Sequence, residues 1–316
     1  MPEREAIVER ERRWLLPAGI ASVAGVALVL ATFGESAAAV RTTAGLAEKL
    51  RDIDADPTPL VLASVVQAIG WLLLAVPLVF LFKAAAARAS RVRSGLLGVV
   101  IVAPIFLAAG SLLGAIAVTE AAGKFTKDGP AAIQRCLDRQ AEKEGTAPDD
   151  PRATCEEQAA RDERTSTSVA GIETGFGLAG LLGFTIAVVY TALWGLRTGL
   201  LSRFWGSLGI ALGVVFSFFT LFTLAWFIYL GLLLAGWVPG GRPPAWGSGE
   251  ARPWPKGGPL FGGGANRDGD DSGDGVIEGE AEEVEVEEVV ETGELTEGPG
   301  DSDRGEAPRK RKKRDS

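Results

Sequence analysis

The chain has 316 residues, of which 47% are hydrophobic, and it carries a formal net charge of −8. It contains no histidine, a single methionine at position 1 and two cysteines. The absence of histidine excludes Ser-His-Asp and Cys-His catalysis, His-ligated zinc and haem ligation by histidine. Several uninterrupted apolar runs of about twenty residues exceed what a soluble core holds, so the composition favours a membrane protein.

Charge is distributed unevenly along the chain. Residues 266–316 hold eighteen acidic and eight basic side chains, whereas residues 1–265 hold twenty-two acidic and twenty-four basic ones. The acidity therefore belongs to the C-terminal segment, and the apolar part of the chain is slightly basic.

Four apolar stretches are long enough to cross a hydrocarbon core of about 30 Å. They lie at about residues 15–33, 60–82, 96–118 and 169–194, and none contains lysine or arginine. Residues 36–39, just after the first stretch, resemble a signal-peptidase site. A cleaved signal has an apolar region of only about 7–15 residues, so we favour an uncleaved first span.

The stretch from Phe204 to Trp237 is ambiguous. Its thirty-four residues are too long for one simple crossing, and two crossings of about seventeen residues each are at the short limit. The absence of Gly, Pro and Asn between Val215 and Thr223 favours one tilted helix. Tryptophans near both ends instead favour a hairpin that returns to the same interface. The residues alone leave five and six spans open.

Basic residues in the short loops orient the chain. Arginines precede the first span, basic residues crowd the loop after the second, and Arg197 and Arg203 follow the fourth. These segments share one side, which the positive-inside rule makes cytoplasmic. Residues 1–14 are then a cytoplasmic N-terminus, and residues 34–59 and 119–168 lie outside.

The outer loop at residues 119–168 is predicted to form a small helical hairpin. A first helix starts at Asp128–Pro130 and ends at Gly145, and a second starts at Asp150–Pro151 and runs to about Arg164. The two cysteines of the chain, Cys136 and Cys155, fall one in each helix. An oxidising exterior would allow them to pair, so we predict a disulfide. The alternative is two free buried thiols.

Residues 238–316 differ in composition from the apolar part of the chain. In the Gly- and Pro-rich part, Trp246 and Trp254 either lie at the headgroup level or belong to a solvated linker. The whole segment 238–316, including the acidic stretch that follows, is predicted to be disordered. It ends in a basic cluster formed by Arg309, Lys310, Arg311, Lys312, Lys313 and Arg314. This cluster either pairs with the acidic stretch or contacts anionic lipids or a cytoplasmic protein; no nucleic-acid partner is expected.

Two polar residues inside the apolar spans are the candidate functional residues. Gln67 lies well inside the second span, and Glu173 lies near the outer end of the fourth. Intramembrane polar residues mark functional sites by default. The alternatives are a helix-packing contact for Gln67 and an interfacial carboxylate that reaches water for Glu173. No paired carboxylates of a proton-coupled transporter occur in the spans.

No pattern of a catalytic, cofactor or metal site is present. The sequence lacks a nucleophile–base pair, a Walker A loop, a dinucleotide fingerprint and a Cys-x-x-Cys pair, so we predict that the protein is not an enzyme. Glycine pairs four residues apart (110/114, 171/175 and 209/213) predict close helix packing and allow self-association through small-residue faces.

The membrane exit carries a recognisable run. Pro239-Gly-Gly-Arg-Pro-Pro-Ala-Trp246, followed by Pro253-Trp-Pro255, resembles a juxtamembrane motif of a family of uncharacterised bacterial multi-pass membrane proteins. The run from Leu200 to Ile210 is similar to the loop-to-helix segment of the same proteins. The resemblance covers about residues 14–255. It implies six spans, the last two at about 204–219 and 221–237, a cytoplasmic C-terminus, a location in the bacterial plasma membrane and no assigned activity.

The sequence therefore predicts an all-α polytopic transmembrane bundle over residues 15–237, with a small extracytoplasmic helical hairpin and a disordered tail. The functional hypothesis is a non-enzymatic scaffold or regulatory protein whose cytoplasmic tail recruits partners. The alternative is a small-solute transporter or channel that uses polar groups such as Gln67.

Overall fold

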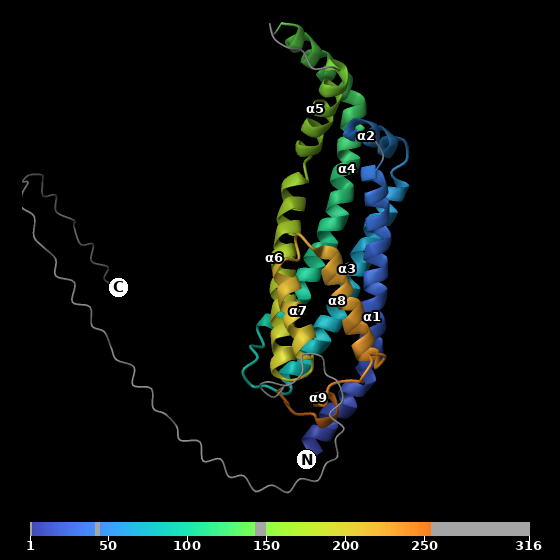
Figure 1. Ribbon diagram of the computed structural model, residues 1–316. Coiled ribbons are helices and arrows are strands. Elements are labelled where there is room, and N and C mark those ends of the chain that lie inside the picture. The colour runs from blue at the N-terminus through green and yellow to red at the C-terminus, as the bar shows by residue number, and fades with distance from the viewer. Residues whose placement is uncertain (1, 42–44, 143–149, 254–316) are drawn as a thin grey trace, which may run out of the picture. The chain divides into compact units, whose positions relative to one another are not determined.

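The computed structural model describes residues 2–41, 45–142 and 150–253 (Figure 1). Contacts within the chain divide it into two units, residues 1–265 and 266–316. The second unit lies wholly outside the described residues, and so do the predicted acidic stretch and the basic cluster from Arg309 to Arg314.

The described residues form helices and contain no strand, which confirms the prediction of an all-α fold. The helices are α1 (Pro2–Arg41), α2 (Leu46–Ala55), α3 (Thr58–Ala86), α4 (Leu96–Ala141), α5 (Pro151–Thr165), α6 (Ala170–Arg197), α7 (Arg203–Val214), α8 (Thr220–Ala235) and the single turn α9 (Ala245–Ser248).

Four of these helices, α1, α3, α4 and α6, are long and apolar enough to cross a membrane. They contain the four apolar stretches that the sequence predicts. Their outward faces remain apolar: Leu62, Ile116 and Leu178 are each more than half exposed (63%, 54% and 56%). An apolar surface of this extent suits lipid rather than water as the surrounding solvent. The chain therefore has the architecture of a membrane-embedded protein.

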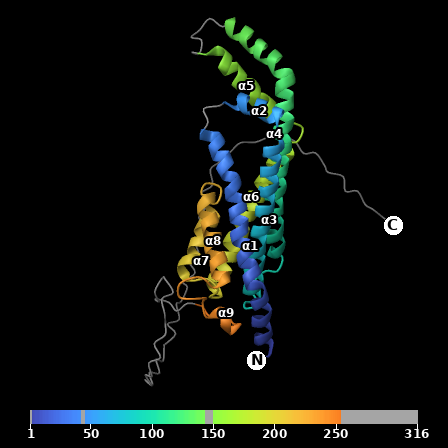
Figure 2. The ribbon, with the colours of Figure 1, turned by 90° about the vertical axis from the view of Figure 1, so that its right-hand side faces the viewer.

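The helices pack in the order α1, α3, α4, α6, α7 and α8, and α8 returns to α1 (Figures 1 and 2). Glycines allow close approach at two crossings. A Cβ added at Gly25 of α1 would lie 3.0 Å from the carbonyl oxygen of Gly70 in α3. A Cβ added at Gly19 would lie 2.8 Å from the carbonyl oxygen of Gly231 in α8. In lipid, such backbone contacts replace the hydrophobic drive that packs helices in water.

The stretch from Phe204 to Trp237 is not one tilted helix, because it breaks into α7 and α8. The turn between them lacks Gly, Pro and Asn, as the sequence shows, but hydroxyl groups satisfy carbonyls on either side of it. Thr220 Oγ1 donates to the carbonyl oxygen of Phe216 at 2.9 Å, and Thr223 Oγ1 donates to that of Leu212 at 3.1 Å. The single helix that the missing turn formers favoured therefore does not form.

The α7–α8 hairpin is shorter than its neighbours. At about 1.5 Å per residue, its helices of 12 and 16 residues would extend about 18 and 24 Å, less than the hydrocarbon core of about 30 Å. The hairpin turn ends below the upper ends of α1 and α6 in the view of Figure 1. Three phenylalanines around the turn, Phe218, Phe219 and Phe222, are exposed (85%, 50% and 62%), whereas Phe216 is buried.

At the end of the bundle opposite α9, three segments form a helical cap: α2, residues 119–141 of α4, and α5. The predicted helix start at Asp128–Pro130 is wrong, because α4 continues without a break through Pro130. Apolar contacts hold α4 at this point: Phe125 is buried with Leu50 of α2 and Ala160 of α5. The second helix starts as predicted, with the Asp150 carboxylate accepting from the backbone nitrogen of Ala153 at 3.0 Å.

Polar contacts also join α2 to α5 in the cap. Arg51 donates to Glu156 at 2.9 Å, and this hydrogen bond holds the pKa of the Glu156 carboxyl below its usual range. The same guanidinium lies 5.5 Å from the centre of the Phe125 ring. The amide of Leu46 donates to Glu157 at 2.8 Å and fixes the first turn of α2.

A disulfide joins the two arms of the cap. Cys136 of α4 and Cys155 of α5 are bonded, with their Cα atoms 5.7 Å apart. The short connection between α4 and α5 brings the two cysteines together although they are separated by 19 positions.

We expect Cys136→Ser to destabilise the cap by about 3 kcal/mol, because loss of the bridge frees the loop that it closes. Thermal unfolding of the purified chain with and without reductant measures the loss, and the wild type in reductant is the matched control. Denatured wild type should bind no maleimide before reduction and two equivalents after it. Full labelling of both cysteines without reductant would contradict the bridge.

Candidate functional site

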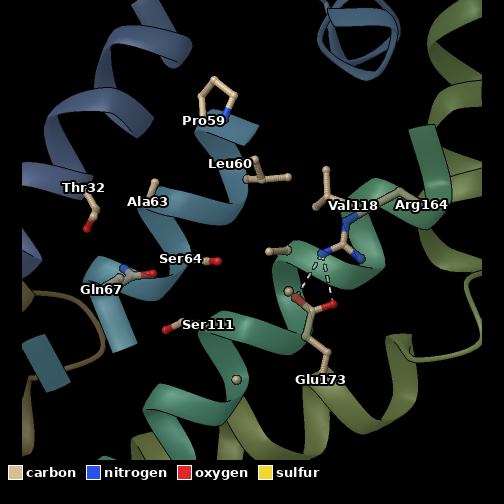
Figure 3. Close-up of a pocket in the computed structure, with 13 residues that line it drawn as sticks. Thr32, Pro59, Leu60, Ala63, Ser64, Gln67, Ser111, Val118, Arg164 and Glu173 are labelled. Carbon is tan, nitrogen blue, oxygen red and sulfur yellow. Dashed lines mark hydrogen bonds and ion pairs between the residues drawn. The ribbon is translucent and has the colours of Figure 1, made fainter. Parts of the chain in front are cut away.

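A recess of about 450 Å³ lies among α1, α3, α4 and α6 in the half of the bundle next to the cap (Figure 3). Its volume falls in the range of about 300–1,000 Å³ that is usual for pockets that take small molecules. Its polar lining consists of Thr32, Ser64, Gln67, Ser111, Arg164 and Glu173. The remaining lining residues are small or apolar: Pro59, Leu60, Ala63, Gly110, Gly114, Ala115 and Val118.

Gln67 projects into this recess from α3, near Ser64 of the same helix and Ser111 of α4 (Figure 3). Both serine hydroxyls donate within their own helices, Ser64 to the carbonyl oxygen of Val61 at 2.8 Å and Ser111 to that of Leu107 at 2.9 Å. Their oxygens keep lone pairs that can accept a further hydrogen bond. Among the described residues, none donates to or accepts from the Gln67 amide. The recess therefore offers a free amide between two acceptor oxygens.

Glu173 lies on the opposite side of the recess, in the first turn of α6. Nη2 of Arg164, in the last turn of α5, donates to both of its carboxylate oxygens at 2.9 and 3.0 Å. Gly114 of α4 makes room for this ion pair, because a Cβ there would lie 3.2 Å from Oε1 of Glu173. The carboxylate is thus neutralised by a cation from the cap rather than solvated alone.

The structure brings the two sequence-predicted residues, Gln67 and Glu173, to the same recess, although they come from different helices. Sequence reasoning missed Arg164, Ser64 and Ser111. The two serines could have been recognised as site residues, because each places a hydroxyl inside an apolar span. Ser64 also lies one helical turn before Gln67. Arg164 carried none, since its pairing with Glu173 depends on the turn between α5 and α6.

An aromatic cluster lies on the α9 side of the recess. It consists of Trp71, Phe184, Phe216 and Phe227, all buried. Trp71 follows Gln67 by one turn of α3, and its ring centre lies 5.7 Å from that of Phe184 and 6.1 Å from that of Phe216. Phe184 contacts Phe227 at 5.8 Å. None of these four rings lines the recess, and Trp71 places the cluster one helical turn from Gln67.

A second cluster lies at the α9 end of the bundle, around Arg88. The Arg88 side chain is fully buried and Glu11 of α1 is 7% exposed. Arg88 Nη1 and Nη2 donate to the two carboxylate oxygens of Glu11 at 2.5 and 2.8 Å. Nε and Nη2 also donate to the carbonyl oxygen of Ala245 at 3.2 and 3.1 Å. One guanidinium thus ties α1, the end of α3 and α9 together.

Trp246 does not belong to a solvated linker. It is 5% exposed, its ring stacks on Phe80 at 5.8 Å, and its Nε1 donates to the carbonyl oxygen of Leu200 at 2.9 Å. The Arg88 guanidinium lies 5.6 Å from the ring centre. The solvated linker and the predicted disorder are wrong for this residue, because the packed bundle forms an apolar cleft that accepts it. The headgroup-level interpretation stays a prediction. Trp254 lies outside the described residues.

The packing of the predicted glycine pairs differs from one pair to the next. Gly209 and Gly213 face Trp226 and Val189, and a Cβ added at either would lie 2.7 Å from the neighbouring side chain. Gly171 and Gly175 have no atom within 4 Å of an added Cβ. That small face of α6 is open in the single chain.

No family model, curated protein or solved structure matches this chain. The resemblance based on the Pro-Gly-Gly-Arg-Pro-Pro-Ala-Trp run therefore stays a prediction. In the part of the chain that the structure describes, no group of three or more Cys, Asp or Glu side chains is arranged to hold a metal ion.

Proposed function

We propose that the chain is a non-enzymatic integral membrane protein of the scaffold or regulatory kind, whose bundle holds the base of a partner-recruiting tail. The observation that carries the proposal is the docking of residues 245–252 onto the bundle. Trp246 is buried between Phe80 and Leu200. Glu250 pairs with Arg4 of α1, and the amide of Arg252 donates to the carbonyl oxygen of Thr198 at 3.1 Å. A tail that only extends into solvent would not require such an attachment to the bundle.

Deletion of residues 266–316 tests this role. We expect the truncated chain to insert normally and to lose the proteins that co-purify with the full chain, because the anchored segment ends before the deletion. A second variant with alanine at all six positions from Arg309 to Arg314 separates contact with anionic lipid from protein recruitment. Retention of the same partners by the truncated chain would argue against a recruiting tail.

The topology that we propose has six crossings, with the last two formed by the short α7–α8 hairpin. Both the N-terminus and the tail then lie in the cytoplasm, and the bundle spans the plasma membrane of a bacterium. In support, the basic segments around Arg4, Arg88 and Arg203 lie at the α9 end, and the disulfide lies at the other. Protease added to sealed cells should leave the tail intact, and cleavage of the tail from outside would overturn this orientation.

A second candidate function is a small-solute transporter or channel, and the recess around Gln67 favours it. Transport would require the solute to pass the aromatic cluster, whose buried rings pack on the α9 side of the recess. We expect Gln67→Leu to reduce solute flux into reconstituted vesicles by about tenfold if this amide recognises the solute, which corresponds to one lost hydrogen bond. Ile69→Leu, on the exposed face of α3, is the matched control. Equal flux through both variants would eliminate the role of Gln67 in transport.

A further inference from the structure

The recess lies where the shortest helices of the bundle stop. In the half of the bundle near α9, α7 and α8 occupy the space between α6 and α1. Toward the cap these two helices have ended, and the recess is bordered there by Thr32 of α1 and Glu173 of α6. The ring centre of Phe216, in the hairpin turn, lies 6.1 Å from that of Trp71, which follows Gln67 by one turn of α3. The hairpin turn thus lies beside a polar space at the depth of the apolar spans.

An exposed apolar surface lies at the hairpin turn. Phe218, Phe219 and Phe222 surround the hairpin turn and are 85%, 50% and 62% exposed. Single exposed apolar residues are ordinary on a membrane helix, but three phenylalanines at a turn form a continuous surface suited to acyl chains. A molecule that occupies both features must have a polar group joined to apolar chains.

The charges in the recess select against an ionic group. Arg164 is the one cation among the lining residues, and both of its contacts in the recess go to Glu173. An anion would have to compete with a carboxylate that this guanidinium already holds, and a cation would have to displace the guanidinium. The net charge of the lining is zero, so an uncharged polar group is favoured.

The remaining polar atoms of the recess accept hydrogen bonds more readily than they donate them. The hydroxyl groups of Ser64 and Ser111 already donate their protons to carbonyl oxygens of their own helices. Gln67 adds one amide that both donates and accepts. Hydroxyl groups are both donors and acceptors, so several of them on one ligand complement this set.

From these four observations we propose that the recess binds the uncharged, hydroxyl-rich headgroup of an amphiphile from the cap-side leaflet, whose chains lie over the phenylalanines of the hairpin turn. The headgroup enters sideways from the lipid, between α1 and α6. The inference does not depend on the tail and goes beyond the proposed function.

Native mass spectrometry of the full chain in nanodiscs tests the proposal. The nanodiscs contain phosphatidylcholine with equal small amounts of monoglucosyl diacylglycerol and phosphatidylglycerol of the same chains. We expect the monoglucosyl lipid to remain bound about tenfold more often than phosphatidylglycerol, and Gln67→Leu to remove this preference, which corresponds to about one lost hydrogen bond. Ile69→Leu should keep it. Equal retention of the two lipids by the wild type would overturn the proposal.

Two further measurements test whether the apolar chains of the ligand contribute to binding. Phe218→Ser, at an exposed position that leaves the packed core intact, should weaken retention of the monoglucosyl lipid while the thermal midpoint stays unchanged. Free glucose added in large excess should not displace the lipid, because it lacks the chains. Displacement of the lipid by glucose, or full retention of the lipid by Phe218→Ser, would overturn the proposal that the ligand is an amphiphile. The occupant of the recess would then be a soluble polyol.

Discussion

Replacing Arg88 with methionine should lower the free energy of unfolding by about 3–5 kcal/mol, because it leaves the carboxylate of Glu11 buried without its cation. The substitution also removes both hydrogen bonds to the carbonyl oxygen of Ala245 and the contact of the guanidinium with the Trp246 ring. Thermal unfolding of the purified chain in detergent measures the loss. Limited proteolysis should show earlier cleavage within residues 245–253, since α9 loses its anchor.

Two variants control this result. Arg91→Met removes an exposed arginine three residues further along the chain and should change stability little. Combining Arg88→Met with Glu11→Leu removes both buried charges and should be less destabilising than Arg88→Met alone. If the double variant were the less stable of the two, the unpaired carboxylate would not be the cause of the loss.

Replacing Gly19 with valine should separate α1 from α8 and destabilise the bundle by about 1–3 kcal/mol or more. A Cβ at this position would lie 2.8 Å from the carbonyl oxygen of Gly231 and 3.1 Å from the amide nitrogen of Ala235. Both are backbone atoms, so no side chain can move aside to relieve the contact. The hydrogen bond from Ser22 Oγ to the carbonyl oxygen of Phe227, 2.7 Å long, should weaken as the helices part.

Gly98→Val is the matched control for this substitution. Gly98 also lies in a long apolar helix, and a Cβ added there has no atom within 4 Å. The same residue change therefore tests helix propensity without crowding. Equal thermal midpoints for the two variants would show that the α1–α8 contact contributes little.

The sequence was sufficient to predict the helices that depend on local composition. The four long apolar helices were predictable because lipid demands about twenty apolar residues per crossing. The start of α5 was predictable from Asp150 and Pro151, whose capping and fixed φ act within one turn. Gln67 and Glu173 were recognisable because polar groups are rare in such spans, although their common recess was not.

The features that were not predictable depend on contacts between distant residues. The break between α7 and α8 relies on the hydroxyl groups of Thr220 and Thr223. These groups stabilise the turn only once the hairpin has formed. The continuation of α4 through Pro130 relies on the burial of Phe125 against α2 and α5. Docking of Trp246 relies on a cleft assembled from α3 and the segment after α6. Local rules do not include these tertiary terms.

The cluster around Arg88 is completed only by residues that are made late in the synthesis of the chain. Domains and their elements fold as they leave the ribosome, N-terminal parts first. Arg88 is made 157 positions before Ala245, the residue whose carbonyl completes its coordination. Until then the arginine relies on Glu11 and the carbonyl oxygen of its own helix at Ala84. A chain that ends before Ala245 therefore lacks both this acceptor and the Trp246 ring beside the guanidinium.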